Sequence, residues 1–393
     1  MLLRENFKLL ITNPIVKCMD ANISPLVIST LQTYRGNDFF WNRNTEKNKK
    51  DFEFIFNTKE IFKDKFIKSI TNGKRVVLTA NSKKVLKIAK TICDENDIKN
   101  LLIFSETPEN IKNNITSEIL EEVQVFMFSP TITCGVDIQV PFDEVFCYFN
   151  NNCNDVNSCI QMTNRVRNIN NKKMEIFLDL NHSKENENID LMMRNRIHLF
   201  KNMEAYRQTM SCELDENFNI DYDKNSDWYK LIKNILMNRA KSHNNFMIFF
   251  MGLLLQMGGV LIDEVVRRKG RNEDWIKGED ILNDNEAKIY DETELITEYY
   301  YRELKDQEDK TPEEYEQIKK YIIDDVFIYR ADKKIFPKLE INLDVHSLLK
   351  DKTLQNKFKN LYKKDKDFVL NGDVSACDMK EKCSNYKWVF GII

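Results

Sequence analysis

A hydroxyl-rich segment, SPTITCGVD at positions 129–137, contains residue types that suit a nucleotide or nucleic-acid ligand. It directly follows the apolar run VQVFMF, and loops at the carboxyl ends of parallel strands are where α/β sheets bind ligands. Gly135 lets backbone approach a ligand closely, and the Asp137 carboxylate can accept a hydrogen bond from a ribose hydroxyl. Taken alone, a segment of this kind is most often a surface loop that binds no ligand.

A second segment, QMTNRVR at 161–167, carries two arginines beside a polar amide. Guanidinium groups bind phosphate oxygens in pairs and remain charged, so Arg165 and Arg167 suit a triphosphate. If the segment is helical, Gln161 and Arg165 share one face at i and i+4. The bland alternative is a pair of surface arginines that make salt bridges.

The elements around these segments predict an α/β domain. Continuous apolar runs predict buried strands, and a helical period over 82–93, with Ser82 at the N-cap position, predicts a crossover helix. The predicted strands span 75–79, 101–104, 123–128, 145–149 and 174–180. Both polar segments therefore follow strands of one parallel sheet.

The flanking regions have a different character. Before residue 70 we expect a strand at 15–19, a helix at 25–34 and an exposed Asn/Lys-rich loop within 39–54. After residue 190 the pattern is mainly helical and charged, with the clearest helices at 192–210, 226–242 and 312–327. The apolar stretch 246–262 is too short for a membrane span, so we expect a core helix ending near Gly258 and Gly259, then a strand at 260–265.

Composition narrows the classes of partner and compartment. The formal net charge is only -3, so any nucleic-acid contact has to come from a local basic patch. Nine cysteines without CxxC spacing and four scattered histidines indicate neither a disulfide framework nor a zinc site. We expect no metal site, no membrane association and no signal peptide, and a reducing intracellular compartment: cytoplasm, nucleus or viral replication site.

The two polar segments together resemble motifs V and VI of superfamily 2 helicases. They are most similar to the replication origin-binding helicases of herpesviruses and large DNA viruses, in which a TPTIT-G-V loop precedes a Q-M-x-x-R-V-R helix. Further similar stretches are KCMDANI at 17–23, GKRVV at 73–77, NSKK at 81–84, FDEVF at 142–146 and SHNNF at 242–246 with Gly258.

The resemblance implies a RecA-like parallel sheet with flanking helices, followed by a mainly α-helical accessory region. It divides the chain into a connecting segment (1–70), a second motor domain (71–185) and the accessory region (186–393). Arg165 and Arg167 would then act on ATP as phosphate contact and arginine finger, although the finger assignment stays open because the Gln161-to-Arg167 spacing is one residue short of the common pattern.

The resemblance also assigns contacts to other residues. Gln161 would sense the nucleotide or couple it to DNA, and Gly135 and Asp137 would bind the nucleotide. The residues that would contact DNA are Asn81, Ser82, Lys83, Ser129, Thr131 and Thr133.

The phosphate-binding loop of a complete motor, GxxxxGK[ST], does not occur in the sequence, and no DExH box precedes the motifs. We therefore expect a fragment or half of a helicase that binds ATP and Mg²⁺ only with a first RecA-like domain, in cis or trans, and does not hydrolyse ATP alone. The expected partners are single-stranded or forked DNA and replication proteins. The alternatives are a non-catalytic DNA- or replisome-binding subunit with the same fold, and an unrelated α/β protein.

Overall fold

The computed structural model describes residues 25–36, 52–132, 138–181, 212–214, 220–222, 227–263, 272–307 and 310–323. The predicted strand at 15–19, the predicted helix at 192–210 and the site residues Thr133, Gly135 and Asp137 lie outside these residues.

The strands are β1 (Glu53–Phe56), β2 (Val76–Ala80), β3 (Asn100–Ile103), β4 (Val125–Phe128), β5 (Glu144–Asn150), β6 (Lys173–Asp179), β7 (Cys212–Leu214), β8 (Ile220–Tyr222) and β9 (Val260–Asp263). The helices are α2 (Pro25–Arg35), α3 (Lys59–Thr71), α4 (Lys83–Glu95), α5 (Glu109–Lys112), α6 (Ser117–Glu122), the 3₁₀ turn η1 (Pro130–Ile132), α7 (Val156–Thr163), α10 (Asp227–Asn244), α11 (Phe246–Gln256), α12 (Glu273–Glu292), α13 (Glu298–Asp306) and α14 (Pro312–Ile323).

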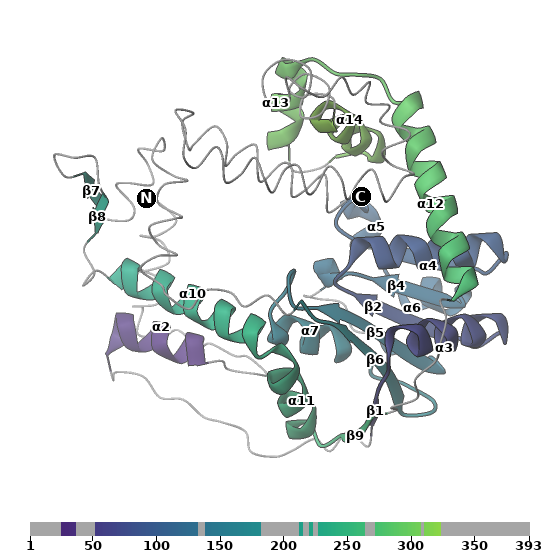
Figure 1. The fold of residues 1–393 in the computed structure, drawn as a ribbon, viewed down its shortest axis with the longest axis horizontal. Coiled ribbons are helices and arrows are strands. Elements are labelled where there is room, and N and C mark those ends of the chain that lie inside the picture. Colours follow the sequence, from purple (N-terminus) through teal and green to yellow (C-terminus); the bar gives the residue numbers. More distant parts are fainter. Residues whose placement is uncertain are drawn as a thin grey trace, which may run out of the picture.

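A seven-stranded sheet lies in the lower right of Figure 1, with the strand order β3-β4-β2-β5-β6-β1-β9. Every neighbouring pair in it is parallel, whereas β7 and β8 form a separate antiparallel pair. The five predicted strands correspond to β2–β6, and helices α10–α14 follow β6 in the chain. The expected RecA-like α/β fold with a helical region after it is confirmed.

Two strands extend the sheet beyond the range 71–185 expected for it. β1 pairs with β6 on one side and with β9 on the other. β1 was not predicted, because it lies at the end of a polar stretch of the sequence that we expected to be an exposed loop. Phe52 and Phe54 are nevertheless buried. β9 was predicted as a strand but without a partner, because its pairing joins residues some two hundred positions apart, which no local pattern reveals.

Helices cover both faces of the sheet, as a parallel sheet requires. On one face, α7 and α11 pack against strand residues that include Phe128, Val145 and Phe149. On the other, α3 and α4 cover β2 and β5, and α12 lies across both helices. The ring centroids of Trp275 in α12 and Phe66 in α3 lie 6.2 Å apart, so part of the accessory region packs against the sheet domain.

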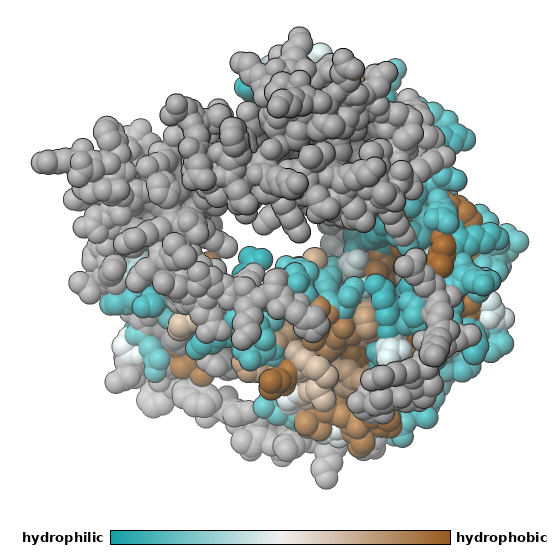
Figure 2. Space-filling model, in the orientation of Figure 1, coloured by the Kyte–Doolittle hydropathy of each residue, from teal (hydrophilic) through white to brown (hydrophobic). Residues whose placement is uncertain are grey.

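Helix α11 was predicted as a core helix, and only one side of it is buried. Phe246, Phe250 and Leu254 are buried in the core, while Ile248 is 70% and Leu255 52% exposed. Figure 2 shows hydrophobic surface gathered in the lower part of the molecule, where α11 and β9 lie. None of the helices in the described ranges is both long and apolar enough to cross a membrane.

The turn from α11 into β9 yields a stability prediction. A Cβ at Gly259 would lie 2.0 Å from the Phe54 ring and 3.0 Å from the Phe52 carbonyl oxygen. Gly259→Ala should therefore lower the free energy of unfolding by about 1–3 kcal/mol through overpacking. Urea denaturation measures the change.

Gly252→Ala is the matched control, because a Cβ at that position of α11 would meet no atom within 4 Å beyond its chain neighbours and the backbone of its own helix. Alanine is favoured over glycine inside a helix by roughly 0.8–1.0 kcal/mol, so this variant should be as stable as the parent or more stable. Equal stability of the two variants would contradict the packing at Gly259.

Candidate functional site

The two polar segments meet through their backbones. Ile138, which follows Asp137 in the sequence, donates its N–H to the Arg165 carbonyl (3.1 Å) and accepts from the Arg167 N–H (3.2 Å). A second bridge between Phe142 and Ile169 continues the pairing. The end of the hydroxyl-rich loop is therefore tied to the arginine segment, although many residues separate them in the sequence.

The arginines follow α7 rather than lying on it. The helix begins at the Asp155 N-cap, whose side chain accepts from the Ser158 N–H at 2.8 Å, and ends at Thr163. The segment is not helical as far as Arg165, so Gln161 and Arg165 do not share a helical face; the chain leaves α7 before Arg165 and pairs with Ile138.

The side chains of the arginine segment differ in how deeply they are buried. Val166 is fully buried, Arg165 is half-buried and Arg167 is exposed. Val166 is part of the core, and Arg165 and Arg167 flank it in the sequence. Gln161 is half-buried on α7.

Ser129 and Thr131 begin the hydroxyl-rich loop at the end of β4. Their hydroxyl groups lie 2.9 Å apart, and the Ser129 N–H donates to the Ile103 carbonyl of β3. Ser129 is buried, whereas Thr131 is exposed. Thr133, Gly135 and Asp137 lie outside the described residues, so their DNA and nucleotide contacts stay predictions.

Asn81 uses its side chain to extend the sheet. Its amide nitrogen donates to the Asn150 carbonyl at 2.8 Å, and its amide oxygen accepts from the Asn150 N–H at 2.9 Å. Asn151 does the same with Asn181, at 3.0 and 2.8 Å. Asn81 is buried, and both ends of its amide are bound within the protein. This amide therefore positions the strand ends.

The ends of β2 and β5 form a topological switch point. After β2 the chain turns through α4 toward β3, whereas after β5 it turns through α7 on the opposite face toward β6. In open α/β sheets ligands bind in the crevice outside such a point. The predicted loop Asn81–Lys83 and the Asn-rich loop after β5 lie on either side of it.

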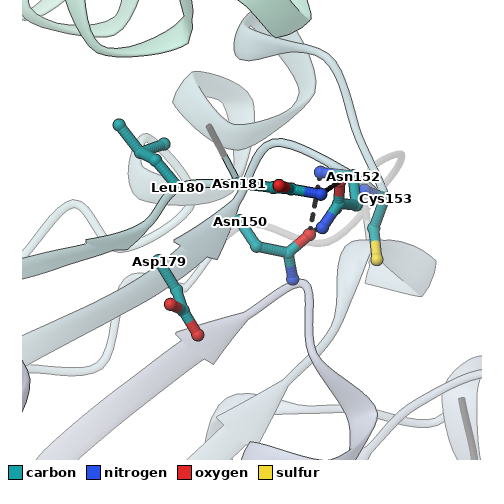
Figure 3. Close-up of a pocket in the computed structure, with 6 residues that line it drawn as sticks. All are labelled: Asn150, Asn152, Cys153, Asp179, Leu180 and Asn181. Carbon is teal, nitrogen blue, oxygen red and sulfur yellow. Dashed lines mark hydrogen bonds between the residues drawn. The ribbon is translucent and has the colours of Figure 1, made fainter. Parts of the chain in front are cut away.

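A cavity of about 260 Å³ lies beside this point, at the ends of β5 and β6 (Figure 3). Its floor is fixed by the Asn150 side chain, whose amide oxygen accepts from the N–H groups of Asn152 and Cys153. Tyr148 donates to Asp179 at 2.5 Å, and burial, followed by this carboxylate, raises the pKa of Tyr148. The lining residues are Asn150, Asn152, Cys153, Asp179, Leu180 and Asn181. The sequence did not predict the cavity, although the run NNNCN after β5 was its signal.

Ser82 and Lys83 begin α4 beside the switch point. Ser82 occupies the N-cap position, as predicted, but its side chain makes no capping bond. Lys83 is paired with Glu106, and its ammonium lies 5.5 Å from the centre of the Phe104 ring. Burial, followed by the nearby charges of Lys87 and Lys319, lowers the pKa of Lys83 to about 7.

Arg75 directly precedes β2 and binds the loops at the opposite, amino-terminal ends of the strands. Its guanidinium donates to the Pro141 and Leu120 carbonyls at 2.9 and 2.7 Å and stacks on Phe142. Asp143 accepts from the Asn170 side chain and from the Arg75 N–H, and these hydrogen bonds, the Asn170 one first, hold the pKa of Asp143 below its usual value. This network fixes the segment that pairs with the arginines.

Viral proteins with helicase and replication names are similar in sequence to parts of this chain. Over 301 residues, 72% of this chain, the sequence is 23% identical to an African swine fever virus protein (isolate Pig/Kenya/KEN-50/1950) named as a helicase/primase complex protein. Over 145 residues, 35% of this chain, it is 29% identical to an Acanthamoeba polyphaga mimivirus protein named as a replication origin-binding protein. No protein-family model matches the chain.

The matched segment spans only 28% of the African swine fever virus protein and 18% of the mimivirus protein. Among solved structures, the C-terminal part of the Fun30 ATPase domain shares 14% identity with a TM-score of 0.25, over 46% of this chain and 53% of that one. A likeness at that score carries no argument. The chain is thus similar to part of much longer replication proteins of large DNA viruses.

The asparagine pairing at the switch point gives a second prediction. Asn81→Asp keeps the acceptor for the Asn150 N–H but replaces the donor to the Asn150 carbonyl by a carboxylate oxygen. The variant should lose about 1–3 kcal/mol of unfolding free energy at pH 7. The folded state favours the protonated acid, which can donate, so its pKa is raised above the unfolded value and the loss should shrink as pH falls.

Chemical denaturation at pH 7 and pH 4.5 measures both effects, with Asn152→Asp as control. Asn152 lies in the loop after β5 but is exposed, and its amide oxygen already acts as an acceptor. That substitution should leave stability nearly unchanged at both pH values. A loss at Asn81 no larger than the loss at Asn152 would rule out the pairing role.

Proposed function

We propose that this chain supplies the second RecA-like motor domain of a DNA helicase in viral genome replication, with a helical accessory region attached. The observation that carries the proposal is the pairing of Ile138 with Arg165 and Arg167. It joins the loop that resembles motif V to the segment that resembles motif VI. Similarity to viral helicase/primase complex and origin-binding proteins supports the same assignment.

In this proposal the arginine segment faces ATP held by a first motor domain, in cis or trans. Arg165 and Arg167 flank the buried Val166, and one of them stabilises the charge that develops on the γ-phosphate. Asp137 and Gly135 contact the ribose side of the nucleotide, and Gln161 couples nucleotide state to α7. The first domain supplies the phosphate-binding loop and the carboxylate that holds Mg²⁺.

The single strand of DNA runs along the carboxyl edge of the sheet. Ser82, Lys83, Ser129, Thr131 and Thr133 contact its backbone, and Asn81 holds the ends of β2 and β5 beneath it. Replication proteins at an intracellular site of viral replication are the further partners. Without its first motor domain the chain is inactive as an ATPase.

Reconstitution tests the proposal. We expect no single-strand-stimulated ATP hydrolysis from this chain alone, and hydrolysis after addition of the first motor domain of the same replication protein. Arg165→Ala and Arg167→Ala should each reduce kcat, and the variant that removes the finger should reduce it on the order of 10³-fold. Steady-state kinetics at saturating single strand measure the change.

Arg302→Ala is the matched control, because Arg302 lies exposed on α13, where it pairs with Glu298 at i and i+4. It should leave kcat unchanged. Hydrolysis by the chain alone would reveal a phosphate site of its own and contradict the proposal. Mixed domains that stay silent would favour the non-catalytic DNA-binding subunit.

A further inference from the structure

Two lysines from distant parts of the chain converge on one carboxylate. Lys83 begins α4, Lys319 lies on α14, and Glu106 lies in the turn between β3 and α5. One Glu106 oxygen pairs with the Lys83 ammonium, and the other lies 3.9 Å from the Lys319 ammonium. Lys319 also pairs with Glu316 of its own helix.

Lys319 and Glu106 are largely buried, so this arrangement differs from an ion pair on the protein surface. Lys319 is only 5% exposed, and the Glu106 side chain is 11% exposed. An ammonium group is buried at a high cost in free energy unless an anion neutralises it. The Phe104 ring forms an apolar wall on one side of the Lys83 ammonium. The two lysines thus form a shielded site for two oxygens of one anion.

The surroundings of the site favour a phosphate group. It lies at the N-terminal turn of α4, a helix of 13 residues, where backbone N–H groups and the helix dipole favour negative charge. Ser82, at the N-cap position, makes no side-chain capping bond. The site also adjoins the switch point at the ends of β2 and β5, where the proposed single strand passes.

We propose that Lys83 and Lys319 form a binding site for a backbone phosphate of single-stranded nucleic acid, and that Glu106 occupies this site when no strand is bound. The inference rests on the proposed function, which places the strand against the loop after β2. It adds Lys319, and with it helix α14 of the accessory region, to the contacts with the strand. Glu106 acts as a competing anion within the chain.

The charges that face Lys83 give the site a pH dependence. They come from Lys87 on α4, Glu286 on α12, Glu316 and Lys319 on α14, and Glu106. With a pKa near 7, Lys83 is partly neutral at neutral pH. A phosphate binds the charged lysine more strongly than the neutral one, so strand binding should weaken as Lys83 loses its proton above pH 7.

Fluorescence anisotropy with a labelled dT20 oligonucleotide tests the site in the full chain. Glu106→Gln keeps the shape of the side chain but removes the competing charge, so dT20 should bind about tenfold tighter if Glu106 fills the site about nine-tenths of the time. Glu298→Gln makes the same change of charge on exposed α13 and should leave the affinity unchanged.

Lys319→Met supplies a second, independent variant, because the apolar side chain suits the buried position. It should weaken dT20 binding and reduce the slope of log affinity against log salt by about 0.7, the value for one phosphate contact on a single strand. It should also abolish the gain from Glu106→Gln. Thermal melting shows whether each variant is folded. If Glu106→Gln does not fold, Lys319→Met alone tests the inference.

Three results would overturn the inference. The first is that the parent chain binds dT20 and neither Glu106→Gln nor Lys319→Met changes the affinity. That result would leave the proposed motor function intact, because reconstituted ATP hydrolysis tests the motor function separately. Another is a gain for inorganic pyrophosphate without a gain for dT20, which would assign the site to a free phosphate. The third is the absence of dT20 binding by both the parent and Glu106→Gln.

Discussion

Parallel pairing throughout the seven-stranded sheet is the constraint on which the rest of the structure depends. A parallel sheet needs helices on both faces, so its strands are mostly apolar runs that bury few polar side chains, such as those of Thr79 and Glu175. Most polar side chains of the strands lie at or near the strand ends, and the carboxyl ends all lie on one side of the sheet. Loops that leave β2, β4, β5 and β6 therefore gather there, which is why a site can form from segments far apart in the sequence.

Side-chain amides and backbone bridges make that edge rigid. Asn81 and Asn151 continue the ladder beyond the last strand residues, and each satisfies both polar groups of a neighbouring backbone unit. The bridge from Ile138 to the arginine segment does the same on the side of α7. Groups that bind a phosphate or a transition state work best when they are already in position, because no binding energy is then lost in ordering them.

The accessory helices belong to the same body as the sheet. Helix α12 packs so closely on α4 that a Cβ at Gly278 would lie 2.6 Å from the Ile92 side chain. Lys84 and Lys87 of α4 form ion pairs with Glu279 and Glu286 of α12. The acidic character of these helices, which in the sequence suggests a solvated surface, in part neutralises lysines beside the candidate site. Lysines and glutamates that lie far apart in the sequence are thus paired in the fold.

The sequence by itself determined the α/β class, the five strands β2–β6, the positions of the two polar segments and the helix α11, because each depends on a local apolar period or a short motif. Only the tertiary structure decided that β1 and β9 complete the sheet and that Arg165 lies beyond α7. It alone decided that the Asn81 amide serves the strand ends and that Lys319 meets Glu106. Each of these depends on which distant segments the fold brings together, and a pattern within one segment contains no information about its neighbour in space.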